Sequence, residues 1–160
     1  MGWAVFCIFL LICAGEDLWR RAVDVWVYLV FGCIAVGLTG WHAAGLPADG
    51  WKLAADALAG FAVGAGLLAV GWICPGGIGA GDGLFFCVSG LYLGLWNNLL
   101  LLWLTSMLSG LFCLGYYVWG KLIQRKNLGL ETVPFLTFAA VPGIWMTAQA
   151  FGRLLAENRV

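Results

Sequence analysis

A run of 38 residues without a charge, from Gly83 to Gly120, is the feature of this sequence that most restricts its fold. As one α-helix the run would be about 57 Å long, because each residue adds about 1.5 Å. The hydrocarbon core of a bilayer is only about 30 Å thick. A single spanning helix is therefore excluded, and we expect the run to fold back at Asn97 and Asn98 into two spans.

The composition favours lipid as the solvent of most of the chain. Hydrophobic residues make up 63% and charged residues 10%, with a mean hydropathy of +0.97, whereas soluble domains are about 45–50% apolar and about 25% charged. Unpaired backbone groups are costly in hydrocarbon, and the apolar runs lack the alternation of barrel strands, so we predict helices. The formal net charge is zero, which argues against a nucleic-acid partner.

Charged residues divide the chain into six apolar stretches, compared with about 20 residues for a typical span. These stretches are residues 2–16, 24–41, 53–73, 83–96, 99–120 and 133–152. We therefore predict an all-α, polytopic membrane protein of about six transmembrane helices, with one domain over residues 1–160. No basic segment precedes the first stretch, so we expect a retained span rather than a cleaved signal.

Lysine and arginine are distributed unevenly between the predicted connections. Three connections that would share one side carry five of the eight basic residues, Arg20, Arg21, Lys121, Arg125 and Lys126. The positive-inside rule assigns this side to the cytoplasm. We accordingly predict a multi-pass protein of the cytoplasmic (inner) membrane with both termini outside.

Three residue types are expected to serve packing or anchoring. Gly60, Gly64 and Gly66 would let helices approach closely. The six cysteines form no CxxC pair and are expected to be buried, unpaired thiols. Tryptophans near the span ends are typical of interfacial anchors; they are Trp3, Trp19, Trp41, Trp51, Trp72, Trp96 and Trp119.

Asp17 and Asp82 are the acidic residues that stand out, because a carboxylate at a membrane edge is a functional candidate by default. Asp17 follows the first span in GEDLWRR, and Asp82 precedes the fourth in GGIGAGD. Two spans intervene between them. Both aspartates are therefore expected on the same membrane face, whichever way the protein is oriented.

The glycines before Asp82 predict a cleft. The span from Gly83 to Trp96 has 14 residues, about 21 Å as a helix, so its start should lie beneath the membrane surface. Irregular backbone at that depth is tolerated only next to protein or water, so Gly76 to Gly81 are expected to line a cleft. Glycines there would let an extended peptide approach closely.

Two carboxylates in such a cleft can perform acid–base chemistry. Repulsion between like charges makes a close pair hold a single proton near neutral pH. The ionised member can take a proton from a water that attacks a peptide carbonyl, while the protonated member donates one. The sequence does not say which aspartate has which role, and the mechanism needs no metal or cofactor.

Structural roles compete with catalysis at both positions. Asp17 could simply pair with a neighbouring arginine, and Asp82 could cap a helix after a glycine turn. Of the other acidic residues, Asp24 is a candidate cap of the second span, and Asp56 is expected across the membrane from the pair. Glu16 adjoins Asp17 but should point elsewhere on a helix.

The order of these motifs resembles the bacterial and archaeal prepilin peptidases, membrane aspartyl proteases with a first aspartate after one span and a GxGD motif before a later one. The matching segments are DLWRR at Asp17 to Arg21, GAGD at Gly79 to Asp82, and TVPFLTF at Thr132 to Phe138. The resemblance extends over nearly the whole chain. Because the chain lacks a cysteine-rich cytoplasmic domain, it is similar to the short, peptidase-only form.

The resemblance implies removal of the basic leader from pilin-like preproteins at the cytoplasmic face. Asp17 and Asp82 would be the catalytic pair, and Gly79 and Gly81 would shape the substrate-binding loop. Which preprotein is cleaved, and the oligomeric state, are left open.

Two positions depart from the family pattern: Val23-Asp24-Val25 stands where Ile-Pro-Asn is common, and Leu84 where lysine is common. The alternatives are an inactive relative, a presenilin-like GxGD protease, and a non-enzymatic assembly or proton-conducting protein that uses the same carboxylates.

Overall fold

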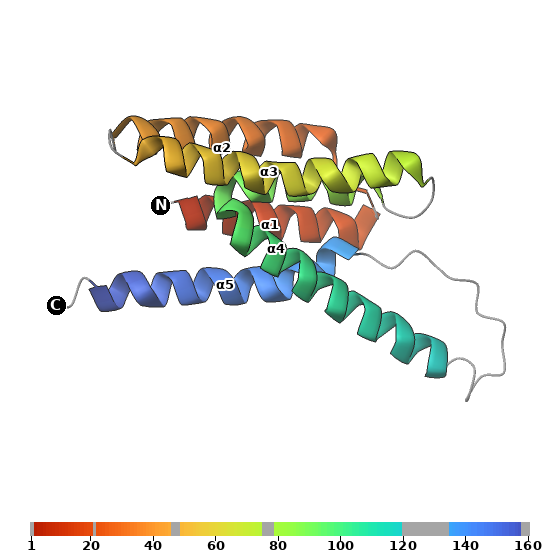
Figure 1. Cartoon of the computed structure of the whole chain (residues 1–160). Coiled ribbons are helices and arrows are strands. Elements are labelled where there is room, and N and C mark those ends of the chain that lie inside the picture. The colour runs from red at the N-terminus through yellow and green to blue at the C-terminus, as the bar shows by residue number, and fades with distance from the viewer. Residues whose placement is uncertain (1, 21, 46–48, 75–78, 120–134, 158–160) are drawn as a thin grey trace.

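The protein is a bundle of α-helices. The computed structural model describes residues 2–20, 22–45, 49–74, 79–119 and 135–157, and every element among them is helical (Figure 1). The helices are α1 (Gly2–Arg20), α2 (Val25–Gly45), α3 (Gly50–Ile73), α4 (Ala80–Trp119) and α5 (Phe135–Glu157). All five are long and apolar enough to cross a membrane. The predicted all-α, polytopic fold is therefore confirmed, with five such helices rather than six because the fourth and fifth predicted spans form one broken helix.

The break in α4 lies at Gly94, so the predicted turning point at Asn97 and Asn98 was wrong by three to four residues. Gly94 has φ 72° and ψ −176°, a conformation open in practice only to glycine. We call residues 80–93 the first arm and residues 95–119 the second arm. In Figure 1 the second arm runs back from the turn. The uncharged run does fold back, as its length required.

A buried asparagine ties the two arms of α4 together. Asn98 Nδ2 donates to the backbone oxygen of Phe86 at 3.0 Å and to that of Gly60 at 3.0 Å. Ser89 Oγ donates to Asn98 Oδ1 at 2.7 Å. Twelve residues of straight helix would separate Phe86 from Asn98 by about 18 Å, so this contact requires the turn at Gly94.

Asp56 of α3 supports the same turn. Its Oδ1 accepts a hydrogen bond of 3.1 Å from the backbone N–H of Leu95, the first residue of the second arm. The first turn of a helix leaves backbone N–H groups without intrahelical partners. Asp56 therefore caps the second arm from a neighbouring helix, a role that the sequence did not indicate.

The contact between α3 and α4 is the most extensive in the bundle, and glycines make it close. A Cβ on Gly60 would meet the backbone of Gly90, and a Cβ on Gly64 would meet the backbone of Cys87. The prediction of close helix packing is thus confirmed for Gly60 and Gly64. It was wrong for Gly66, where a Cβ would meet nothing within 4 Å, because this residue faces away from α4.

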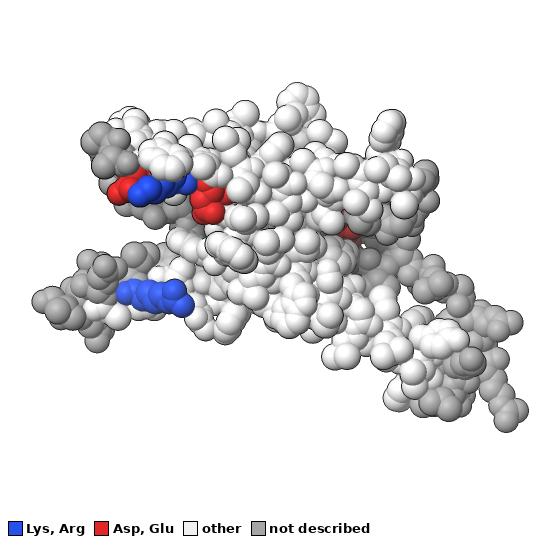
Figure 2. Space-filling model, in the orientation of Figure 1, with Lys and Arg blue, Asp and Glu red and all other residues white. Residues whose placement is uncertain are grey.

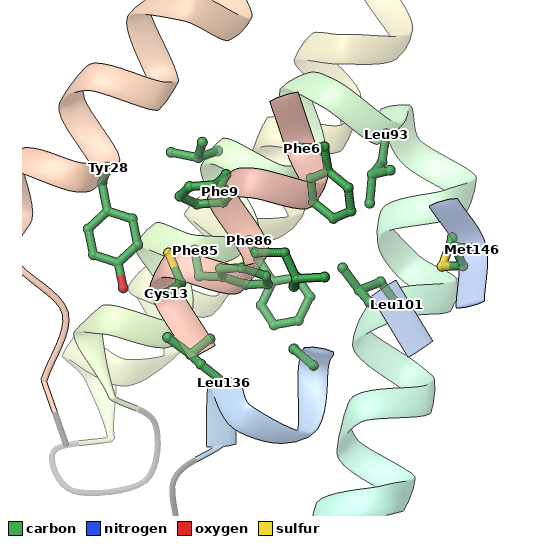
Figure 3. Packing of buried hydrophobic residues seen from close by; sticks show 13 residues of the cluster. Phe6, Phe9, Cys13, Tyr28, Phe85, Phe86, Leu93, Leu101, Leu136 and Met146 are labelled. Atoms are coloured by element: carbon green, nitrogen blue, oxygen red, sulfur yellow. The ribbon is translucent and has the colours of Figure 1, made fainter. Parts of the chain in front are cut away.

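The core lies around α1, which contacts α2, α4 and α5. Figure 3 shows aromatic and aliphatic side chains from these helices meeting around Phe9. Phe9 stacks on Phe85 with ring centroids 5.4 Å apart, and its ring also meets Tyr28 edge-on at 6.3 Å. This cluster fixes the end of α1 against the start of α4, where the two candidate aspartates lie.

The outer surface has the character of a lipid-facing one. On the face drawn in Figure 2, charged side chains form only a few small patches and most of the surface is uncharged. Most of the tryptophans predicted as anchors point outward; those exposed are Trp19, Trp41, Trp51, Trp72, Trp96 and Trp119. The prediction was wrong for Trp3, which is partly buried and packs against the core. All six cysteines are free. Cys13 and Cys87 are buried as predicted, whereas Cys33 and Cys74 lie on the exposed surface.

Candidate active site

Asp17 is a buried carboxylate in the last turn of α1, with only 9% of its surface exposed. Its Oδ2 accepts hydrogen bonds from the backbone N–H groups of Leu136 at 2.8 Å and Thr137 at 3.2 Å. Thr137 Oγ1 in turn donates to the backbone oxygen of Ala14 at 3.4 Å. Asp17 therefore caps the first described turn of α5 and joins the two helices at this end of the bundle.

The hydrogen bonds of Asp17 can be compared with the contacts of Arg20, one of the two arginines that closely follow it in the sequence. Both hydrogen bonds end on Oδ2, and Oδ1 makes none with the described residues. Arg20 instead pairs with Asp24 at 3.7 Å, where both side chains are exposed. The described contacts of Asp17 are thus those of a helix cap, and Arg20 is not its partner. Arg21, the other neighbouring arginine, lies outside the described residues.

Asp82 lies in the first turn of α4, immediately after the described part of the glycine loop. Its backbone N–H donates to the oxygen of Gly79 at 3.1 Å, and that of Gly83 reaches the same oxygen at 3.4 Å. The side chain bends back over this turn. Its Oδ2 lies 3.2 Å from the position that a Cβ on Gly79 would occupy, so the glycine leaves room for the carboxylate.

The fold brings Asp17 and Asp82 to the same end of the bundle. Asp17 lies in the last turn of α1 and Asp82 in the first turn of α4, although 65 positions separate them in the sequence. The number of intervening spans predicted that both aspartates lie on the same side. Their shared end of the bundle confirms this prediction. The reason is that α2 and α3 run to the far end and back, so α4 begins beside the end of α1 (Figure 1).

A cleft opens beside the glycine loop. It has a volume of about 330 Å³ and is lined by Leu67, Leu68, Gly71, Trp72, Gly79 and Ala80. Gly79 is exposed and Gly81 is partly exposed. A cleft is therefore present at Gly79 and Ala80, but Gly81, Asp17 and Asp82 do not line it. The part of the prediction that concerned Gly76 to Ile78 lies outside the described residues.

Three other acidic residues, Glu16, Asp24 and Asp56, make contacts away from Asp17. Glu16 Oε2 accepts the backbone N–H of Asp24 at 3.1 Å, so it faces the connection to α2, as its position on the helix predicted. Asp24 immediately precedes α2, but its described side-chain contact is with Arg20. Asp56 lies at the turn of α4, at the other end of the bundle. None of the three joins Asp17 at the start of α5.

The structure adds one polar group that the sequence analysis did not single out. Tyr28 of α2 is 4% exposed, and its hydroxyl has no hydrogen-bond partner among the described residues. This oxygen lies 3.6 Å from the position that a Cβ on Gly81 would occupy. The signal in the sequence was a hydroxyl-bearing side chain inside an apolar span, which needs a polar partner when buried.

Several predictions concern residues beyond the described ranges. Arg21, Lys121, Arg125 and Lys126, four of the five basic residues behind the predicted orientation, lie outside the described residues, as do Thr132 to Pro134 of the third matching segment. Phe135 to Phe138 of that segment begin α5, and Leu136 and Thr137 are the donors to Asp17. No group of three His, Cys, Asp or Glu side chains suited to a metal ion occurs within the described ranges.

Comparison of the chain with models of protein families, with curated proteins and with solved structures found no match.

Proposed function

We propose that this protein is a membrane-embedded aspartic endopeptidase that removes the leader of pilin-like preproteins at the cytoplasmic face of the cell membrane. The observation that carries the proposal is the position of Asp17 and Asp82, on separate helices, at the same end of the bundle, with Asp17 buried (Figure 1). Acidic side chains within apolar helices are rare, and those inside a bundle mark functional sites by default.

The proposed reaction uses the two carboxylates as an acid and a base that share one proton. The ionised carboxylate accepts a proton from a water as that water attacks the scissile carbonyl carbon, and the protonated carboxylate donates to the departing amine. The C–N bond then breaks, and the pair regains its single proton. The cap on Asp17 Oδ2 fixes the orientation of this carboxylate relative to the start of α5.

The cleft beside Gly79 supports a peptide as the substrate. Apart from its glycine and alanine positions it is lined by Leu67, Leu68 and Trp72, so it suits an apolar side chain of an extended chain. Asp82 immediately follows the Gly79 to Gly81 segment. Asp82 does not line this cleft, so a peptide bound there would reach the carboxylate across the Gly79 to Gly81 segment, which carries no side chain at residues 79 and 81.

The test is co-expression of the full chain with a precursor that carries a basic leader, a glycine and then a hydrophobic helix. Wild type is compared with Asp17→Asn and Asp82→Asn, with leader removal followed by gel mobility and membrane levels by immunoblot. Asp24→Asn is the matched control, because Asp24 is exposed and paired with Arg20. We expect both site variants to lose cleavage and the control to retain it.

A different pattern would favour another function. Cleavage retained by either site variant at normal membrane level contradicts the catalytic pair. Proton movement into liposomes that contain only the purified chain, abolished by the same substitutions, would instead support a proton-conducting protein.

A further inference from the structure

The hydroxyl of Tyr28 is a buried polar group that stabilises no described contact of the fold. Tyr28 is 4% exposed, and its oxygen has no hydrogen-bond partner among the described residues. A buried hydroxyl without a partner costs free energy relative to a satisfied one. Phenylalanine would fill the same space without that cost, so the hydroxyl is best explained by a ligand that it meets during function.

The direction of the hydroxyl indicates where this ligand would be. The oxygen lies 3.6 Å from the position of a Cβ on Gly81, the residue before Asp82. The Tyr28 hydroxyl therefore faces the proposed site from a third helix, α2, on the side of the glycine loop.

Packing holds the tyrosine ring in this direction. Phe9 meets it with ring centroids 6.3 Å apart and an interplanar angle of 71°. In Figure 3 the ring lies at the edge of the apolar cluster, with the hydroxyl oxygen at the end far from the α2 backbone. A donor fixed in this way needs little reorganisation to meet a developing negative charge.

We propose that Tyr28 is a third catalytic residue, whose hydroxyl donates a hydrogen bond to the scissile carbonyl oxygen and to the oxyanion formed when water attacks. The inference rests on the proposed peptidase function. Tyr28 keeps its proton throughout: the new C–O bond comes from water, the C–N bond breaks, and the proton transfers involve only the two carboxylates, the water and the amine.

The test compares Tyr28→Phe with Tyr92→Phe in the purified full chain, using the precursor that wild type cleaves. Tyr92 is the matched control because its hydroxyl donates to the Phe31 backbone oxygen at 2.8 Å and takes no part in the site. Loss of an oxyanion donor typically lowers kcat by about 100-fold or more. We expect this loss in Tyr28→Phe with little change in KM, while Tyr92→Phe keeps the wild-type kcat.

Thermal unfolding distinguishes a catalytic hydroxyl from a structural one. Tyr28→Phe should unfold at the wild-type temperature or above it, because it loses no described hydrogen bond, whereas Tyr92→Phe should unfold at a lower temperature. Wild-type kcat in Tyr28→Phe, or a kcat loss accompanied by a lower unfolding temperature, overturns the role of Tyr28 alone. A wild type that cleaves only as well as Asp17→Asn overturns the peptidase function and this inference together.

Discussion

Asp17 Oδ2 accepts a hydrogen bond of 2.8 Å from the backbone N–H of Leu136, which joins the end of α1 to the start of α5 across 119 positions of sequence. One carboxylate oxygen thus holds a helix in place, while the other makes no hydrogen bond with the described residues. A substitution at this position can change folding, activity or both. The two effects are separable because asparagine keeps an acceptor oxygen and alanine does not.

Asp17→Ala should lower the free energy of unfolding by about 1 kcal/mol, the usual cost of removing a helix cap. Asp17→Asn should keep most of that stability, because its side-chain oxygen can accept the Leu136 N–H. Both should lose precursor cleavage. Unfolding in mixed micelles, followed by circular dichroism, provides the measurement. Equal destabilisation by the two substitutions would show that the cap depends on charge.

Gly79→Ala should impair cleavage without unfolding the protein. Its Cβ would lie 3.2 Å from Asp82 Oδ2, so the carboxylate must move by a few tenths of an ångström. Misplacement of a catalytic group by about 1 Å can cost about 100-fold in rate, and we expect a loss of up to that size in kcat/KM. Gly37→Ala is the control, since a Cβ there meets nothing within 4 Å. An unchanged rate would mean that Asp82 need not occupy this position.

Gly94→Ala should destabilise the turn of α4. The φ of 72° with ψ of −176° costs a residue with a Cβ about 1–3 kcal/mol, and that Cβ would also meet the Asp56 carboxylate. Gly110→Ala in the second arm has open space at its Cβ and should be neutral or stabilising. The free energies of unfolding of the two variants give the comparison, and equal values would contradict the observed turn.

Asn98→Leu should separate the arms of α4. It would leave Ser89 Oγ without its 2.7 Å acceptor and the Gly60 and Phe86 backbone oxygens without the amide donor. Loss of such buried partners costs about 1–3 kcal/mol. Asn97→Leu serves as the control because Asn97 is partly accessible and bonds only one turn back, to Leu93; its unfolding should change by about 0.5 kcal/mol or less. A similar loss in both would argue against a specific role for Asn98.

Gly64→Ala and Gly66→Ala should have opposite effects on stability. The methyl group at position 64 would meet the Cys87 backbone, and overpacking typically costs about 1–3 kcal/mol. At position 66 it meets nothing within 4 Å, so replacing a mid-helix glycine should stabilise by about 0.5–1 kcal/mol. Unfolding of the two variants under identical conditions tests this, and destabilisation by Gly66→Ala would contradict the assigned helix face.

The positions of Asp17 and Asp82 at one end of the bundle were predictable from the sequence. Counting apolar stretches between them was sufficient, since each span reverses the side of the membrane on which the chain emerges. The need for a turn inside residues 83–120 was predictable for a similar reason, because a bilayer has a fixed thickness. Its location was not, because Asn97 and Asn98 are polar and interrupt the apolar run, while Gly94 is one glycine among many.

Three-dimensional contacts decided what each polar side chain does. The amides of Asn97 and Asn98 are adjacent in sequence, yet one bonds within its own helix and the other crosses to Phe86 and Gly60. Asp17 and Asp56 cap helices that lie far along the chain from them. The unpaired Tyr28 hydroxyl beside Gly81 became visible only when α2 was packed against α4.

The sequence by itself determined the all-α class, the solvent of the helices and the shared end of the two aspartates, because hydropathy and span length act along the chain and need no partner. Only the tertiary structure decided the site of the α4 turn, the helix caps and the position of Tyr28. Each of these depends on which residue of another helix supplies a hydrogen-bond partner or leaves space, and that relation is set by packing.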